Sequence, residues 1–159
     1  MRDELRYKIP EKGLTIWRIY GFFQTLLVVL VAIIATIITY QLNGPAYIYI
    51  VASTVVVVFA FLFIWLFPNI KHKVWRYEVR EQEVEIQSGL FIVKRTLIPM
   101  VRVQHVDTEQ GPILKKYGLS NISVSSAATI HKIPFLLTGE AAQLRSKISE
   151  LARVAEEDV

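Results

Sequence analysis

The 159-residue sequence contains no cysteine, and no charged residue lies between Ile19 and Phe67. Without cysteine the chain forms no disulfide and no thiolate metal site, and it has no thiol nucleophile. A segment of that length without charge does not have the polar face of a surface helix in a soluble domain. Hydrophobic residues make up 53% of the chain, more than a soluble domain of this size needs, so the excess must have a specific location.

The uncharged region contains two apolar runs long enough to cross a bilayer, at residues 21–40 and 46–67. At 1.5 Å per residue each run forms a helix of roughly 30 Å, which is the thickness of the hydrocarbon core. Between the runs, the sequence Asn43-Gly44-Pro45 favours a tight turn. We therefore predict a transmembrane hairpin over residues 19–68, preceded by a cytoplasmic N-terminal segment at residues 1–18.

Positive charge is concentrated on one side of this predicted hairpin. Arginines and lysines precede the first run, and Lys71, Lys73 and Arg76 follow the second, whereas the connecting loop is uncharged. The positive-inside rule then predicts a multi-pass protein of the cytoplasmic (inner) membrane with both termini in the cytoplasm. Because much of the basic excess lies beside the membrane, the net charge of +4 indicates topology and contact with the lipid bilayer, and we expect no binding of nucleic acid.

The pattern changes after Pro68, which we expect to end the second helix, and residues 69–159 form the predicted cytoplasmic domain. Apolar and polar residues alternate along residues 73–80 and 83–87, which predicts strands with one exposed face. A turn is expected at Ser88-Gly89, and strands are expected in LFIVKRTLIP, after Pro99, and in NISVSSA and HKIPFLL.

The last predicted element has apolar residues at helical spacing and not at the alternating spacing of the strands before it. From Gly139 to Ala152 apolar residues recur at helical spacing, and Thr138 precedes them as a candidate N-cap. The predicted fold is therefore α+β: a curled antiparallel sheet of about seven strands capped by a C-terminal helix.

One stretch, VRVQHVDTEQGPILKKYG from Val101 to Gly118, combines β-type alternation with a Gly-Pro break and a basic pair. The valines at 101, 103 and 106 change phase, which predicts a β-bulge at Gln104-His105. We interpret the rest of the stretch as a basic turn that contains Lys115 and Lys116.

Two segments, HKVWRYEV and QSGLFIVKRTLIPMVRVQHVDTEQGPILKKYGL, resemble the bacterial pleckstrin-homology (PH) domain family of the YdbS type. The preceding hairpin matches the layout of that family across nearly the whole chain. The shared pattern is an Arg-x-Gln strand, a Gln-Gly-Pro turn, a basic pair and a glycine, here Arg102, Gln104, Gln110, Gly111, Pro112, Lys115, Lys116 and Gly118. The resemblance implies a PH-like fold, no enzymatic reaction, and a part in resistance to envelope stress beside a larger membrane protein with related PH-like domains.

Candidate catalytic residues lack a recognised signature. His105 and Asp107 share one face of a strand and could combine with a downstream serine, Ser123, Ser125 or Ser126, but no nucleophile-elbow sequence accompanies them. The three histidines are scattered, without metal-ligand spacing. We therefore expect no enzyme activity, no metal and no cofactor.

Basic residues are the remaining candidates for contact with lipid or a partner. They occur where the chain leaves the bilayer, in predicted strands and after Pro112: Lys71, Lys73, Arg76, Lys94, Arg95, Arg102, Lys115, Lys116 and Lys132. Cations close to a membrane attract anionic lipid, although ordinary solvated charge is the alternative interpretation. Arg102, which valines flank, is expected to pair with a carboxylate inside the fold rather than to contact a ligand.

These features predict a non-enzymatic membrane-anchored module that binds a partner membrane protein or phospholipid headgroups in an envelope-stress or antimicrobial-resistance system. We favour the partner, because exposed strand edges suit the addition of a peptide. The alternative is a subunit of an assembly that moves or senses lipid across the bilayer. A strip of small residues on the first helix, Ala32, Ala35, Thr36 and Thr39, could also support a homo-oligomer.

Overall fold

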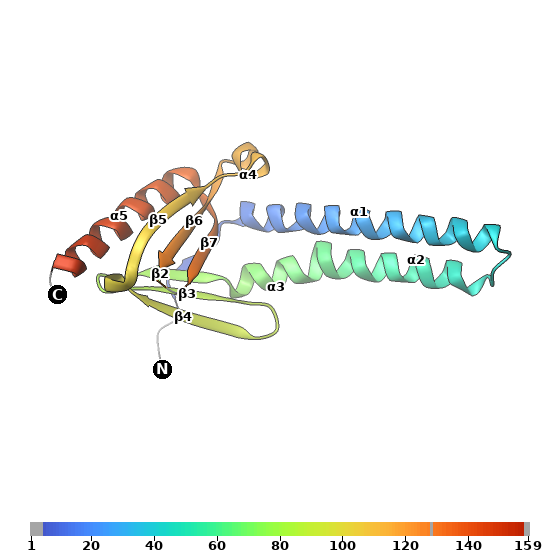
Figure 1. Ribbon diagram of the computed structural model, residues 1–159, viewed down its shortest axis with the longest axis horizontal. Coiled ribbons are helices and arrows are strands. Elements are labelled where there is room, and N and C mark those ends of the chain that lie inside the picture. The colour runs from blue at the N-terminus through green and yellow to red at the C-terminus, as the bar shows by residue number, and fades with distance from the viewer. Residues whose placement is uncertain (1–4, 128, 158–159) are drawn as a thin grey trace. The chain divides into compact units, whose positions relative to one another are not determined.

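The computed structural model describes residues 5–127 and 129–157 (Figure 1). These residues form two compact units, each of which is described by itself. One is the helical hairpin Trp17–Ile70. The other, the PH-like unit, combines the chain up to Ile16 with the chain from Lys71 onward.

The first helix of the hairpin is α1, Glu11–Gln41, and the second is continuous from residue 47 to residue 74. The second helix consists of α2, Tyr47–Ala60, a π-helical segment, Phe61–Leu66, and α3, Phe67–Val74. The prediction that Pro68 ends this helix is therefore wrong. Pro68 lies in the first turn of α3, directly after the wider π-helical turns, where its missing N–H is tolerated.

Both helices are long and apolar enough to cross a membrane, with mean hydropathies of 2.5 and 2.8. Only 11% of the apolar window of the first helix is buried, and none of that of the second. Hydroxyl groups within the hairpin bond to its own backbone, as when Thr25 Oγ1 donates to the Gly21 carbonyl at 2.8 Å. A surface of this kind is unfavourable in water and suits lipid.

The strands of the PH-like unit form two antiparallel sheets, not the single curled sheet of about seven strands that the sequence predicts (Figure 1). The four-stranded sheet has the order β1-β2-β3-β4, with bounds Tyr7–Lys8, Arg76–Val79, Glu83–Gly89 and Val93–Pro99. The three-stranded sheet has the order β5-β6-β7, with bounds Val103–Glu109, Leu119–Ser126 and Ile130–Leu137.

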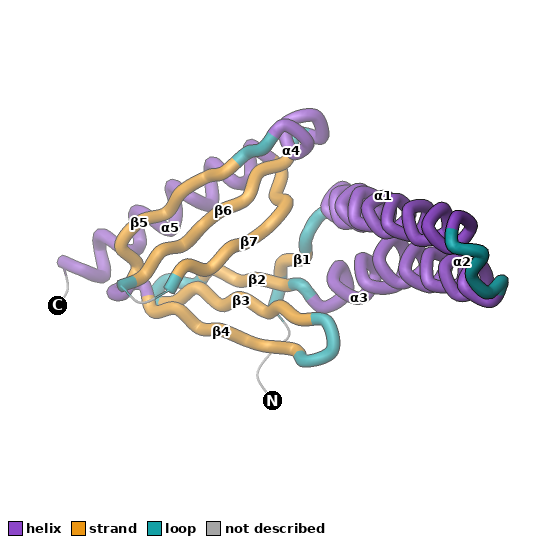
Figure 2. The backbone as a smooth tube through the Cα atoms, turned by 45° about the vertical axis from the view of Figure 1, so that its right-hand side comes forward, coloured by secondary structure: helices purple, strands orange, loops and turns teal. Residues whose placement is uncertain are grey.

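The two sheets separate after β4, which ends at Pro99. Figure 2 shows the chain passing from β4 of one sheet to β5 of the other. Proline cannot donate to a strand ladder, and a single 3-10 turn, Met100–Arg102, follows it (η2). The chain therefore changes direction before β5 begins, so β4 and β5 are not hydrogen-bonded neighbours.

The first strand comes from the N-terminal side of the hairpin. Tyr7 lies opposite Tyr77 of β2, and their rings stack with centroids 5.6 Å apart. Leu5 and Ile9, which flank β1, are buried. In the sequence, the hairpin therefore lies between the first and second strands of one sheet. The prediction that residues 1–18 form a separate segment did not anticipate this pairing.

Two predicted boundaries in the first sheet are wrong. The strand expected from residue 73 starts only at Arg76, because the helix continues through Val74. Ser88 and Gly89 do not form a turn: both pair within β3, and the chain reverses at residues 90–92.

In the family-like stretch the predicted bulge is confirmed, since the register of β5 against β6 shifts between Val103 and His105. The predicted basic turn is instead the short helix α4, Pro112–Tyr117. Proline at its start costs no hydrogen bond, and Gly118 ends it with φ 68°, a left-handed conformation that favours glycine.

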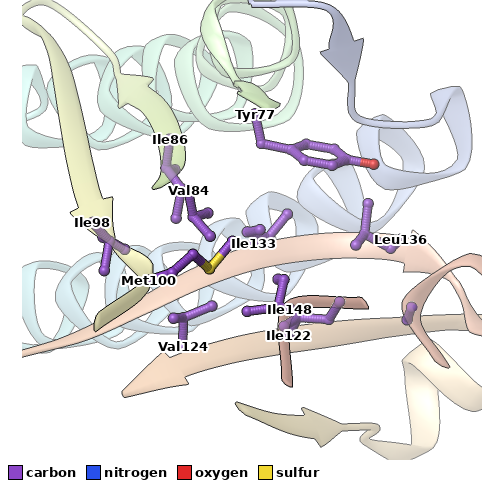
Figure 3. Close-up of a cluster of buried hydrophobic side chains, with 11 residues drawn as sticks. Tyr77, Val84, Ile86, Ile98, Met100, Ile122, Val124, Ile133, Leu136 and Ile148 are labelled. Carbon is purple, nitrogen blue, oxygen red and sulfur yellow. The ribbon is translucent and has the colours of Figure 1, made fainter. Parts of the chain in front are cut away.

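The C-terminal helix α5, Thr138–Glu157, covers the core with the apolar face that the sequence predicts. Ala141 and Ile148 of this face are fully buried, and Leu144 and Leu151 pack beside them. The core (Figure 3) consists of Tyr77, Val84, Ile86, Ile98, Met100, Ile122, Val124, Ile133, Leu136, Ala141 and Ile148. Burial of each large side chain contributes about 1.5–3 kcal/mol before the entropy cost of ordering it.

Candidate functional site

A cleft of about 470 Å³ lies where the two sheets separate. Its walls come from the end of β4, from η2, from the start of β5 and from the β6–β7 turn. We call it the inter-sheet cleft, lined by Leu97, Ile98, Pro99, Val101, Arg102, Gln104, Ser126, Ala127, Thr129 and His131. β4 and β5 are edge strands of their respective sheets, so the backbone edges of both sheets meet this cleft.

The lining of the cleft is amphipathic. Leu97 and Val101 present apolar surface and are 39% and 51% exposed. Arg102, Gln104 and His131 supply the polar groups, and His131 Nε2 lies 2.9 Å from the hydroxyl of Thr129. Such a cleft offers apolar contact together with one permanent cation, one amide and one imidazole.

Local structure explains why Arg102 and Gln104 reach this cleft. Arg102 ends the 3-10 turn that follows Pro99, and Gln104 is the extra residue of the bulge, which has no partner in β6. The bulge re-aims the side chains next to it. The Arg-x-Gln pair of the family-like pattern is therefore placed together by a turn and a bulge.

The internal ion pair expected for Arg102 is not found. Arg102 is exposed, and among the residues that the structure describes it has no carboxylate partner. It is the one candidate among the nine predicted basic residues that lines the inter-sheet cleft.

Arg95, predicted to contact lipid or a partner, is instead held by Glu85. Its Nη2 donates to Glu85 Oε2 at 3.1 Å, and its Nε contacts Oε1 of the same carboxylate. The Glu85 side chain is only 2% exposed, so this ion pair lies largely out of water. Arg80 adds a more distant contact to Glu85 at 4.0 Å. The guanidinium of Arg95 therefore stabilises the fold by pairing with a buried carboxylate.

Lys132 in β7 is also engaged. Its Nζ donates to Glu109 Oε2 at 2.8 Å, while the hydroxyl of Ser123 donates to Oε1 of the same carboxylate. The hydrogen bond from Lys132 is the main reason why the pKa of Glu109 is below its usual value. Both side chains are about half exposed, so this pair is a surface interaction of modest strength.

The remaining basic candidates are distributed over several elements. Lys71 and Lys73 lie in the last turn of α3, and Lys115 and Lys116 lie in the last turn of α4. Lys94 is exposed in β4. The nine predicted residues therefore do not converge on one lysine-rich surface.

The structure does bring together a basic row that the sequence did not reveal. Lys8 lies opposite Arg76, Arg76 lies opposite Gln87, and Gln87 lies opposite Arg95, on four adjacent strands. Residues that face one another across a sheet share one face of it. Lys8 could be recognised as a member of this row only once β1 was known to join the sheet.

The candidate catalytic residues form no connected set. His105 lies opposite Ser125, and Asp107 lies opposite Ser123, but the hydroxyl of Ser123 donates to Glu109. Within the described part of the chain neither His105 nor Asp107 makes a side-chain hydrogen bond, and no three metal-ligating side chains cluster there. The arrangement lacks the nucleophile–base contact that acyl transfer needs.

A second hollow, of about 510 Å³, lies between β1, β2 and α5. Tyr77 lines it, and burial, helped by the charge of Glu140 and by Tyr7, raises the pKa of Tyr77 to about 12. Glu140 and Lys147 give this hollow both signs of charge. We take the inter-sheet cleft as the functional candidate, because it contains the family-like Arg-x-Gln residues and borders two strand edges.

Comparison with known proteins agrees with the layout of both units. The family model "Bacterial PH domain" matches residues 20–152. The UPF0699 transmembrane protein YdbS of Bacillus subtilis (strain 168) is 44% identical over 159 residues, which is all of both chains. The UPF0699 transmembrane protein YdbT of the same strain is 27% identical over 91 residues, which is 56% of this chain and 18% of that protein. No solved structure matches the chain.

Proposed function

Because the chain belongs to the bacterial PH domain family, we propose that it is a non-catalytic membrane module that docks a second membrane protein at the inter-sheet cleft. Its two apolar helices anchor it in the bilayer, as expected for a relative of a transmembrane protein. By the distribution of basic residues, the PH-like unit faces the cytoplasm.

The observation that carries this proposal is the meeting of two strand edges at one amphipathic cleft. Among the described residues, β4 and β5 each have a strand partner on one side only, and the cleft beside their free edges contains Arg102 from the connecting 3-10 turn and Gln104 from β5. An extended segment that adds to such an edge gains main-chain hydrogen bonds, and the adjoining cleft selects its side chains. A carboxylate on that segment would satisfy Arg102.

The charge of the cleft favours a protein over a phospholipid headgroup as the occupant. Arg102 is the one permanent cation in its lining, whereas recognition of a phosphorylated headgroup uses several converging basic groups. Two other predicted lipid contacts, Arg95 and Lys132, are neutralised by Glu85 and Glu109.

A larger membrane protein related to this chain is the class of partner that we propose. YdbT, which is named a transmembrane protein, is related to this chain over only 18% of its own length. A partner of that kind would share the same bilayer, which raises the effective concentration of the two docking surfaces. The family resemblance is our reason for proposing that such a complex acts in resistance to envelope stress.

Site-specific photocrosslinking tests the docking surface directly. Gln104 is exposed in the cleft, so a photoreactive benzoylphenylalanine at this position in the full chain should be tolerated. After irradiation of intact cells we expect one discrete adduct whose second component, identified by mass spectrometry, is a larger membrane protein with a segment related to this chain.

Two matched variants and one matched position control this experiment. Arg102→Glu should abolish the adduct, whereas Arg145→Glu, the same charge change on the exposed face of α5, should leave it intact. The same photoreactive group at Glu81, in the β2–β3 turn, should give no adduct with this protein. Adducts to lipid alone, or equal adducts from positions 81 and 104, would overturn the proposal.

A further inference from the structure

The turn between β3 and β4 exposes apolar side chains to an unusual degree. Phe91 and Ile92 are 80% and 84% exposed, more than any other large apolar side chain in the described part of the chain, and Val93 is 53% exposed. Turns exposed to water are normally built from Gly, Asn, Asp, Ser or Pro. We call Leu90–Val93 the apolar tip.

The tip is presented by a hairpin that is paired to its end. β3 and β4 remain in register up to the pair Gly89 and Val93. Gly89 has φ 150°, and a Cβ on it would lie 2.1 Å from the carbonyl oxygen of Ile92. The chain thus closes tightly over a glycine, and this closure holds Phe91 and Ile92 at the end of the hairpin.

Strand register places the tip at the end of the sheet where residues 71–74 enter it. β2 begins at Arg76, two residues after α3 ends, and Arg76 lies opposite Gln87. Because β2 and β3 are antiparallel, the residues after Gln87 run past the start of β2, back along the segment that enters from α3. The Gln87 side chain donates to the Val74 carbonyl at 3.1 Å, which ties the two segments together.

The distance along β3 from Gln87 to the start of the apolar tip is short. The tip starts three residues beyond Gln87, which is roughly 10 Å of extended strand. α3 carries Lys71, His72 and Lys73 in its last turn, the basic residues that end a membrane span at the level of the headgroups. The apolar tip and these basic residues therefore lie at the same end of the sheet.

Charge next to the tip suits anionic lipid. Lys94 follows the tip directly and is exposed, and Lys71 and Lys73 lie at the same end of the unit. Aromatic and aliphatic side chains flanked by lysines are the composition of segments that insert into the bilayer interface.

We propose that the apolar tip inserts Phe91 and Ile92 into the interfacial layer of the bilayer that the chain itself spans, with Lys94 at the headgroups. A protein partner is a poorer occupant, because a stable protein interface buries about 800 Å² on each side and this tip offers a few side chains. The bilayer needs no such area, because the chain that carries the tip is itself anchored in the membrane, which raises the effective concentration of lipid at the tip. This insertion fixes the orientation of the PH-like unit on the membrane, and it does not depend on what occupies the inter-sheet cleft.

The lack of native cysteine allows a clean test with single-cysteine variants of the full chain. Ile92→Cys labelled with the fluorophore NBD, in vesicles of phosphatidylcholine and phosphatidylglycerol, should be protected from aqueous iodide and quenched by lipids that carry a shallow doxyl group. Glu81→Cys, labelled in the same way, is the matched control, because residue 81 is exposed at the opposite end of β3. We expect at least about a twofold difference in doxyl quenching between the two positions.

Each outcome decides the proposal. Doxyl quenching at position 92 that weakens on Lys94→Ala in anionic vesicles, but not in phosphatidylcholine alone, supports insertion beside anionic headgroups. Equal iodide access at positions 92 and 81 overturns it. Protection from iodide without doxyl quenching also overturns it, because the probe is then buried against protein. Neither failure affects the cleft, which the photocrosslink at Gln104 tests separately.

Discussion

At the scale of single residues, the carboxylate of Glu85 shows that Arg95, which we predicted to contact lipid or a partner, also has a partner inside the fold. Glu85 alternates with Val84 and Ile86 and therefore lies on the sheet face that should be wet, yet its side chain is 2% exposed. Arg95, from the neighbouring strand, pairs with both of its oxygens. Alternation correctly predicts the face of Glu85, but it does not predict that an arginine covers the carboxylate.

Arg95→Ala should destabilise the PH-like unit by about 2–4 kcal/mol, because it leaves a buried carboxylate without its main partner. The free energy of unfolding of the full chain in detergent micelles, from urea titration, measures this loss. Lys94→Ala, a neighbouring exposed charge, should cost less than about 0.5 kcal/mol.

A second change distinguishes the ion pair from simple loss of packing. In the Arg95→Ala background, Glu85→Gln should recover part of the stability, because a neutral amide is less costly to bury than an unpaired charge. If Lys94→Ala and Arg95→Ala are equally destabilising, or if Glu85→Gln gives no recovery, the pair is not what holds Glu85 in place.

Tyr77 gives the PH-like unit a predictable response to alkaline pH. Burial first, and then Glu140 and Tyr7, raise its pKa in the folded state from 10.0 to about 12. The folded unit keeps a proton that the unfolded chain releases in this window. The contribution of Tyr77 to stability is therefore complete below pH 10 and is lost as the pH rises to about 12.

Tyr77→Phe should remove this part of the pH dependence. Other tyrosines and the lysines titrate in both proteins, so the measured quantity is the difference in unfolding free energy between the variant and the parent. The free energy of unfolding of Tyr77→Phe, minus that of the parent, should become more positive between pH 10 and 12, because only the parent loses the contribution of Tyr77 there. Parallel stability curves would show that Tyr77 does not carry the effect.

At the scale of elements, the two helices of the hairpin approach closely at Gly21. A Cβ at this position would lie 2.0 Å from the carbonyl oxygen of Phe63, a backbone atom of the facing helix. Small residues permit such close packing in a membrane, where van der Waals contact drives helix association.

Gly21→Ala should therefore force the helices apart and lower the thermal unfolding midpoint of the hairpin. Tryptophan fluorescence in mild detergent, recorded in a Trp75→Phe background, measures this midpoint, since the two remaining tryptophans, Trp17 and Trp65, lie in the hairpin. Leu27→Ala, on a position that is 66% exposed, is the control and should change the midpoint little. A loss for Leu27→Ala as large as that for Gly21→Ala would contradict the close approach.

The existence and kind of most elements follow from the sequence, and the errors have physical causes. Alternation predicted the strands, and helical spacing predicted α5. Pro68 was expected to stop a helix, but a π-helical segment before it makes proline tolerable. The sequence predicts a turn at Lys115 and Lys116, because the six residues of α4, Pro112–Tyr117, are too few to show helical periodicity.

At the scale of the whole molecule, the division of the chain differs most from what the sequence suggests. β1 contains two residues, too few for a pattern, and it pairs with β2 across the entire membrane hairpin. That long-range pairing also explains why the sheet has an additional edge strand from the N-terminal side. Local sequence cannot reveal a partner that is almost 70 residues away.

The candidate cleft was predictable only in part. The family-like pattern identified Arg102 and Gln104, and the valine phase change identified the bulge that places Gln104. The sequence does not indicate His131, which is one of three scattered histidines, because only the pairing of β6 with β7 brings it to the cleft. The break between the sheets at Pro99 creates the cleft itself, and the expectation of one continuous sheet excluded it.

The central claim is that the cleft, not the lysines, holds a protein partner. Its most direct test is the partner content of the tagged full-length protein, purified from native membranes in mild detergent and quantified by mass spectrometry. The comparison uses Arg102→Glu and a variant with five lysines changed to Ala: Lys71, Lys73, Lys94, Lys115 and Lys116. We predict a stoichiometric membrane-protein partner that remains with the five-lysine variant and is lost from Arg102→Glu. A partner lost from the five-lysine variant and retained by Arg102→Glu would contradict this account.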